Sequence, residues 1–147
     1  MPAKWGFVPR WAKDPEVGTR WINIGVESLM EKAVFRHAFK HRRCLVLADG
    51  FYTWQQMPNG RQPVYIHLKR GRVFGFAGLY ENWTSPQGEN VRTCAIITTV
   101  ANKIVAPMSA QMPVILSRDD ESLWLDHLLK DPTRIPVAVR SSAVLDL

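Results

Sequence analysis

Residues 21–27 alternate between apolar and polar side chains, which is the two-residue period of a half-buried β-strand. Ile22, Ile24 and Val26 fall on one face of this strand. Asn23 and Glu27 fall on the other face. The pattern therefore predicts that these two polar side chains point the same way.

The next segment, residues 28–42, changes to the spacing of an amphipathic helix. Its last turn is basic, which complements the negative end of a helix dipole. The segment therefore predicts the first principal helix. The positions that recur at helical spacing, and so mark its buried stripe, are Met30, Ala33, Val34, His37 and Ala38.

A second helix is predicted after Ser117, which forms a capping box with Asp120. We expect this helix to continue through Leu129. Its candidate buried positions are Leu125, Leu128 and Leu129.

Most of the remaining apolar runs predict β-strands, and residues 58–60 form the tight turn of a hairpin. In the strand before that turn, Thr53 faces away from Tyr52 and Trp54. Many strands with two principal helices predict an α+β fold with a curved, mainly antiparallel, barrel-like β-sheet. The predicted strands are 44–48, 51–56, 64–68, 73–80, 93–99 and 137–144.

Length and composition favour a single domain over residues 1–147, with 46% hydrophobic and 22% charged residues. No apolar run is long enough to cross a membrane, and the first residues do not form a secretory signal. We therefore expect a cytoplasmic protein, associated with the nucleoid if the chain is bacterial. Cys44 and Cys94 lie in apolar stretches, and we expect both to be buried and reduced.

The formal net charge of +6 favours polyanionic partners, with nucleic acid as the first to consider. No acid lies between Glu31 and Asp49, and six basic or histidine side chains fall within residues 36–43. Such a run is equally typical of a solvated helix face. Early tryptophans alternate with basic residues, as they do in proteins that stack single-stranded bases and hold phosphates. These residues are Lys4, Trp5, Arg10, Trp11, Lys13, Arg20 and Trp21.

The common motifs of enzyme chemistry are absent from the sequence. It has no glycine-rich phosphate loop, HExxH, GxSxG or paired CxxC motif. His37 and His41 are one helical turn apart, a spacing more typical of solvated histidines than of metal ligands, and Ser109 has no identifiable general base. We therefore expect no metal site and no cofactor.

Several ordered motifs over nearly the whole chain nevertheless resemble one family, the SOS response-associated peptidase (SRAP) family. The resemblance begins with the run from Trp5 to Asp14 and continues with Asn23 and Glu27. The later matching segments are 43–45, 48–54, 76–81, 96–99, 101–102, 112–116 and 124–125.

The resemblance implies a domain that binds single-stranded DNA and recognises abasic sites. In the family, an N-terminal cysteine attacks the ring-opened abasic aldehyde and closes a thiazolidine, while a glutamate and a histidine transfer protons. The family asparagine, which helps to place the sugar, is matched by Asn23 as a catalytic position. The resemblance assigns nucleic-acid contacts to Trp5, Pro9, Trp11, Glu27 and Thr98.

This chain departs from the family pattern at positions that carry its chemistry. Gly25 replaces an arginine, Thr53 replaces the glutamate, and Ser109 replaces the histidine. Neither threonine nor serine titrates near neutral pH, so general acid/base catalysis fails at these positions. The family's N-terminal segment with its cysteine is also missing before Trp5. We therefore expect DNA binding without efficient covalent chemistry.

Two alternatives remain open at the level of sequence. The chain could be an active abasic-site crosslinker or peptidase whose cysteine is supplied upstream. It could instead be a non-catalytic scaffold that pairs with another chain, as in a homodimer, through a sheet edge left open by the missing N-terminal strands.

Overall fold

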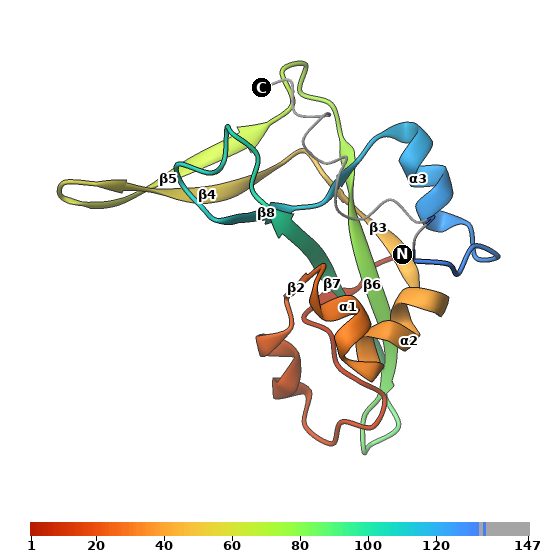
Figure 1. Ribbon diagram of the computed structural model, residues 1–147. Helices are drawn as coiled ribbons and strands as arrows, with labels where there is room; N and C mark the ends of the chain where they lie inside the picture. Colours follow the sequence, from red (N-terminus) through yellow and green to blue (C-terminus); the bar gives the residue numbers. More distant parts are fainter. Residues whose placement is uncertain (133, 135–147) are drawn as a thin grey trace.

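The computed structural model describes residues 1–132 and residue 134 (Figure 1). The strand predicted over 137–144 lies outside the described residues. In chain order the elements are β1 (Lys4–Trp5), the 3₁₀ helix η1 (Pro15–Arg20), β2 (Asn23–Gly25), α1 (Ser28–Glu31), α2 (Ala33–His41), β3 (Arg43–Ala48), β4 (Gly50–Met57), β5 (Gly60–His67), β6 (Phe74–Thr84), β7 (Asn90–Val100), β8 (Gln111–Pro113), β9 (Ile115–Leu116) and α3 (Arg118–Leu125).

The centre of the fold is the long antiparallel pair β6 and β7, which runs through the middle of Figure 1. β3 pairs antiparallel with β6, whereas β1 and β2 pair parallel with β7. The predicted α+β, mainly antiparallel fold is therefore confirmed. Among the described strands the order β1-β7-β6-β3 does not close on itself, so the description as barrel-like holds only loosely.

The central pair separates near one end, and a short downstream segment fills the gap. β6 and β7 pair as far as Gly78 and Ile96; beyond that point β9 pairs with β6 and β8 pairs with β7. Val114 joins the two halves, since its N–H donates to Ile97 O at 2.9 Å and its carbonyl accepts from Ala77 N–H at 3.0 Å. The segment around Val114 therefore continues both central strands at once.

The two faces of the central sheet carry separate hydrophobic cores. Ala77 and Leu79 of β6 face the helices and pack with Phe35, Phe39 and Trp124. The opposite face packs against the β4–β5 hairpin and the loop over residues 101–108. Figure 1 shows this hairpin extending away from the sheet, on the side opposite α2 and α3. The buried residues of the second core are Ile66, Phe74, Phe76, Ile96, Val105, Met112 and Ile115.

The single helix predicted over 28–42 is wrong, because Lys32 is extended (φ −95°, ψ 125°) and divides it into α1 and α2. In a continuous helix, Leu29 and Phe35 would point in different directions, since they are six residues apart. The break lets both side chains enter the helix-side core. It also rotates the buried stripe of α2 to Phe35, Ala38 and Phe39, so Ala33 and His37, which were expected to be buried, are exposed.

The structure also corrects several smaller predictions. Ser117 caps α3 as expected, but the helix ends at Leu125, where Asp126 is extended. Leu125 and Leu128 are exposed, whereas Leu129 is buried as predicted. Ile22 lies before the short β2 and is exposed. Cys44 is only partly buried, since it lines a surface groove beside β3. No helix in the described part of the chain is long and apolar enough to span a membrane.

Candidate functional site

A cavity of about 670 Å³ lies on the sheet face that carries no helices. Its floor comes from Val46, Phe76 and Ile96, one residue from each of β3, β6 and β7. One wall is the base of the β4–β5 hairpin, and the other is the N-terminal segment with β2. The polar side chains that line it are Asn23, Tyr52, Thr53, Thr98, Ser109 and Gln111.

Five residues singled out from the sequence meet in this cavity, although they are up to about a hundred positions apart. They are Trp5, Asn23, Thr53, Thr98 and Ser109. The cavity does not include Pro9, Trp11 or Glu27 among its lining residues. The structure therefore divides the residues named from the sequence into two groups, one inside the cavity and one outside it.

β7 explains how Trp5 and Asn23 come together. Both β1 and β2 pair with the same edge of β7, so that Trp5 lies opposite Cys94 and Asn23 lies opposite Ile96. The indole Nε1–H of Trp5 donates to Ile22 O at 2.7 Å, which fixes the ring beside β2. The Trp5 side chain is still 54% exposed, so its ring presents a surface at the cavity mouth.

Thr53 and Ser109 reach the cavity from two different elements, β4 and the loop before β8. Thr53 is 6% exposed, whereas Tyr52 and Trp54 lie on the opposite face of the strand, as predicted, and are exposed. Tyr52 nevertheless borders the cavity. Ser109 ends the loop before β8, where its hydroxyl donates to Gln111 O at 2.8 Å. The serine hydroxyl is therefore held by its own turn.

Glu27 lies beyond the end of the strand, but its carboxylate is on the strand face that Asn23 and Gly25 share, as the alternation predicted. β2 ends at Gly25, and Glu27 lies in the turn that follows. A Cβ atom added at Gly25 would lie 2.5 Å from Glu27 Oε1. The Glu27 carboxylate therefore occupies the space next to Gly25, and a long side chain at position 25 would displace it.

Cys94 and Tyr52 are the only lining residues of the cavity with titratable side chains, in the part of the chain that the structure describes. Burial raises the pKa of the Cys94 thiol. Burial, and secondly the neighbouring Cys94, raise the pKa of Cys44 to about 12, against the opposing effect of Arg92. Both thiols are therefore protonated at neutral pH and are weak nucleophiles.

We expect Ellman's reagent to leave Cys44 and Cys94 unmodified in the native protein at neutral pH and to modify both after unfolding in guanidinium. The folded state favours the protonated thiol, so the stability that the Cys44 thiol contributes is fully present below its unfolded pKa of 9.0. It is lost as the pH rises toward about 12, the pKa in the folded state. Rapid labelling of the native protein at pH 7 would contradict this assignment.

Sequence reasoning gave no role to Tyr52 or Gln111, which also line the cavity. Tyr52 pairs across the hairpin with Tyr65, and the ring centroids are 5.1 Å apart. The hairpin turn fixes this register. The turn motif and the two tyrosines could therefore have indicated from the sequence that Tyr52 pairs with Tyr65. Gln111 depends on the path of a long loop, for which the sequence has no comparable signal.

Comparison with known proteins gives consistent results. The family model described as SOS response associated peptidase (SRAP) matches residues 1–143. The abasic site processing protein YoqW of Bacillus subtilis is 42% identical over 130 residues, which is 88% of this chain and 58% of that protein. The abasic site processing protein HMCES of Rattus norvegicus is 31% identical over 157 aligned residues, covering 86% of this chain and 44% of that protein. The chain thus spans about half the length of these relatives.

Two solved structures share the fold. A protein from Bacteroides thetaiotaomicron superposes with a TM-score of 0.83 at 28% identity, over 96% of this chain and 61% of that one. A phage-related protein from Bordetella bronchiseptica superposes with a TM-score of 0.63 at 26% identity, over 97% of this chain and 63% of that one.

Proposed function

Since the chain belongs to the SOS response-associated peptidase (SRAP) family, we propose that it acts in the response to DNA damage by binding single-stranded DNA at abasic sites, without covalent chemistry. The observation that carries the proposal is the meeting of Trp5, Asn23, Thr53, Thr98 and Ser109 in one cavity. Two relatives are named abasic site processing proteins, and this chain is similar to them over most of its length.

The cavity suits a nucleotide that has lost its base. Its floor is apolar, and its polar groups are amides and hydroxyls, which can hydrogen-bond a neutral sugar. The exposed ring of Trp5 at the mouth offers a surface on which a flanking base can stack. Phosphates stay outside, where the basic excess of the chain attracts them.

The enclosed position of these groups favours single strands over duplex. An unpaired strand can place one nucleotide between the hairpin and the N-terminal segment, whereas a duplex must first unstack and unpair it. The cost of that opening is a few kcal/mol, which is enough to separate the two affinities by more than tenfold.

The test is a binding titration with a single strand that carries one abasic site, its intact counterpart and a blunt duplex. We expect the abasic strand to bind most tightly and the affinity to fall as salt rises, because bound phosphates release counterions. Asn23→Ala removes the amide beside the sugar and should weaken binding to the abasic strand by roughly tenfold. Asn82→Ala is the matched control, since Asn82 is exposed on β6 and does not line the cavity.

Two outcomes would overturn the proposal. One is equal affinity for the single strand and the duplex. The other is an unchanged affinity of Asn23→Ala for the abasic strand, which would place the bound nucleotide elsewhere.

A further inference from the structure

A second groove, of about 360 Å³, lies on the other face of the sheet, away from the proposed DNA-binding cavity. It runs between α2 and the loop that contains Trp11, and Glu81 lies at its base. Successive side chains of a strand point to alternate faces. Phe76 lines the cavity, so Glu81, five residues later on β6, faces the helices.

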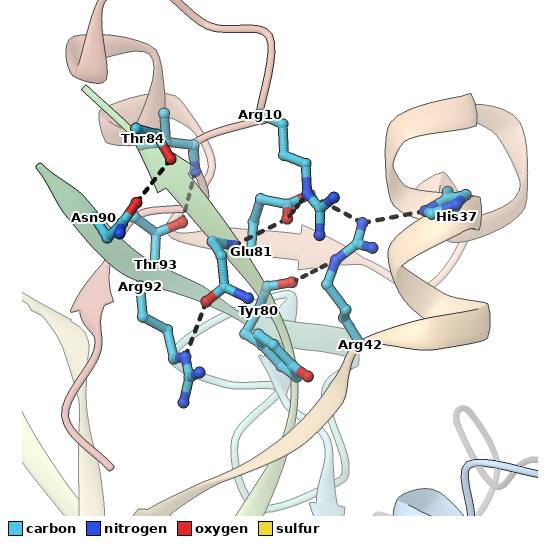
Figure 2. Close-up of polar contacts among 11 residues, drawn as sticks. Arg10, His37, Arg42, Tyr80, Glu81, Thr84, Asn90, Arg92 and Thr93 are labelled. Atoms are coloured by element: carbon cyan, nitrogen blue, oxygen red, sulfur yellow. Dashed lines mark hydrogen bonds and ion pairs between the residues drawn. The ribbon is translucent and has the colours of Figure 1, made fainter. Parts of the chain in front are cut away.

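A buried ion network shapes this groove (Figure 2). The Glu81 carboxylate is 3% exposed; Oε2 lies 2.9 Å from Arg42 Nη2, and Oε1 lies 2.8 Å from Arg10 Nε. Oε1 also accepts a hydrogen bond from Asn82 N–H at 2.9 Å. Arg42 donates in addition to His37 Nδ1 at 3.2 Å. One carboxylate thus holds two guanidinium groups.

The network holds Arg10 through Nε alone. Among the described residues, its two terminal amino groups have no hydrogen-bond partner, and the Arg10 side chain is 65% exposed. Terminal guanidinium nitrogens are the donors that bind phosphate oxygens in a bidentate manner. Glu81 therefore fixes Arg10 in a position from which it can bind an anion.

The loop beside Arg10 presents an exposed aromatic ring. Pro9 and Ala12 are buried on either side of Trp11, and Ala12 N–H donates to Pro9 O at 3.0 Å. The buried indole of Trp83 donates to Ala12 O at 2.7 Å, which anchors the turn. Trp11 itself is 70% exposed, although the residues around it are fixed.

The exposed face of α2 adds more positive charge along the same groove. Lys40 is exposed and is a neighbour of His37 on the helix, three residues later. Arg36 is exposed one turn before Lys40, and one of its terminal nitrogens donates to Met30 O at 3.1 Å. Both cations lie on α2 outside the lining of the groove. The segment from Lys32 to Ala48 contains no acid. A fixed aromatic ring flanked by cations complements a single-stranded nucleic acid, which supplies both a base and phosphates.

We propose that this groove is a second binding surface for single-stranded nucleic acid, with Arg10, Arg36 and Lys40 on the phosphates and Trp11 stacked on a base. It goes beyond the proposed function, because it lies on the opposite face of the sheet and needs no abasic site. A strand long enough to leave the cavity and pass around the sheet edge would occupy both surfaces.

The test compares labelled oligothymidylates of about 5 and about 25 nucleotides, since the short one fills a single surface. We expect the long strand to bind the wild-type protein more tightly. Trp11→Ala should weaken binding of the long strand roughly tenfold. Arg36→Glu with Lys40→Glu should also weaken it and reduce the slope of log affinity against log salt by roughly 1.4, for two lost phosphate contacts. Arg118→Glu with Lys103→Glu is the control with the same charge change.

The outcomes separate the two binding surfaces. The second surface is supported if the α2 and Trp11 variants no longer bind the long strand more tightly than the short one, while Asn23→Ala still binds the long strand. This support holds even if the protein shows no preference for the abasic strand. Wild-type affinity of Trp11→Ala and of Arg36→Glu/Lys40→Glu for the long strand would overturn it. A second result would also overturn it. If a polyaspartate peptide binds the wild-type protein, and these variants lose that binding but keep the binding of DNA, the groove recognises an acidic peptide rather than a nucleic acid.

Discussion

Incubation with single-stranded DNA that carries one abasic site is expected to give no heat-stable, slower-migrating band on a denaturing gel. Among the described residues that line the cavity, none carries a carboxylate, imidazole or amine that could transfer protons near neutral pH. Thr53 and Ser109 stand where the family resemblance places the glutamate and the histidine. Burial keeps Cys94 protonated. General acid/base catalysis typically contributes 10²- to 10⁴-fold, so its loss removes most of the covalent reaction.

The experiment needs evidence that the aldehyde is present and that the protein is bound. Treating the same oligonucleotide with an alkoxyamine gives a labelled strand and verifies the aldehyde. A native gel run in parallel should show a complex that heat and denaturant abolish. A band that survives heat in stoichiometric amount would show that the chain carries out covalent chemistry and would contradict the proposed non-covalent mode.

Glu81→Ala is expected to destabilise the fold by about 3–5 kcal/mol, because it leaves the buried guanidinium of Arg42 without its counter-charge. In a chain of this length that loss corresponds to a fall in Tm of roughly 6–20 °C. Thermal unfolding followed by circular dichroism measures it. The effect comes from an uncompensated buried charge rather than from the loss of one attractive contact.

Two further variants test that explanation. Arg10→Ala should change the unfolding free energy by no more than about 1 kcal/mol, because the Arg10 side chain is mostly exposed and water can take its place beside Glu81. Adding Arg42→Met to Glu81→Ala should recover part of the lost stability, because no unpaired charge then remains in the interior. If the double variant is less stable than Glu81→Ala alone, the explanation is wrong.

The sequence predicted the hairpin and the main antiparallel strands well, because local turn residues and alternation specify them. Residues 58–60 set the β4–β5 register, and Ser117 set the start of α3. The break at Lys32 was not predictable from periodicity, because it satisfies the burial of Leu29 and Phe35 against a sheet formed by distant residues. The strand 23–25 lies parallel to β7 for the same reason, since pairing over such separations leaves no local pattern.

In the candidate site, too, the sequence indicates which residues take part but not how distant residues come together. The family resemblance selected five residues of the cavity, whereas their proximity depends on β7 as a common template and on the separation of β6 and β7. Strand alternation predicted that Glu27 points the same way as Asn23. β2 ends earlier than predicted, at Gly25, yet the Glu27 carboxylate still lies on the face that Gly25 shares with Asn23. Trp11 was grouped with Trp5 because both are near the start of the chain. The structure instead places Trp11 in the groove against α2.

The two cores on either side of the central sheet separate the residues of the cavity from most of the packing that holds the fold. Thr53, Ser109 and Gly25 all lie outside the helix-side cluster of Phe35, Phe39 and their neighbours, which supplies the larger share of buried side chains. Substitutions at these three positions therefore leave most of the folding free energy intact. A protein built in this way is mutationally tolerant at these three positions, so the side chains there are free to diverge while the fold persists.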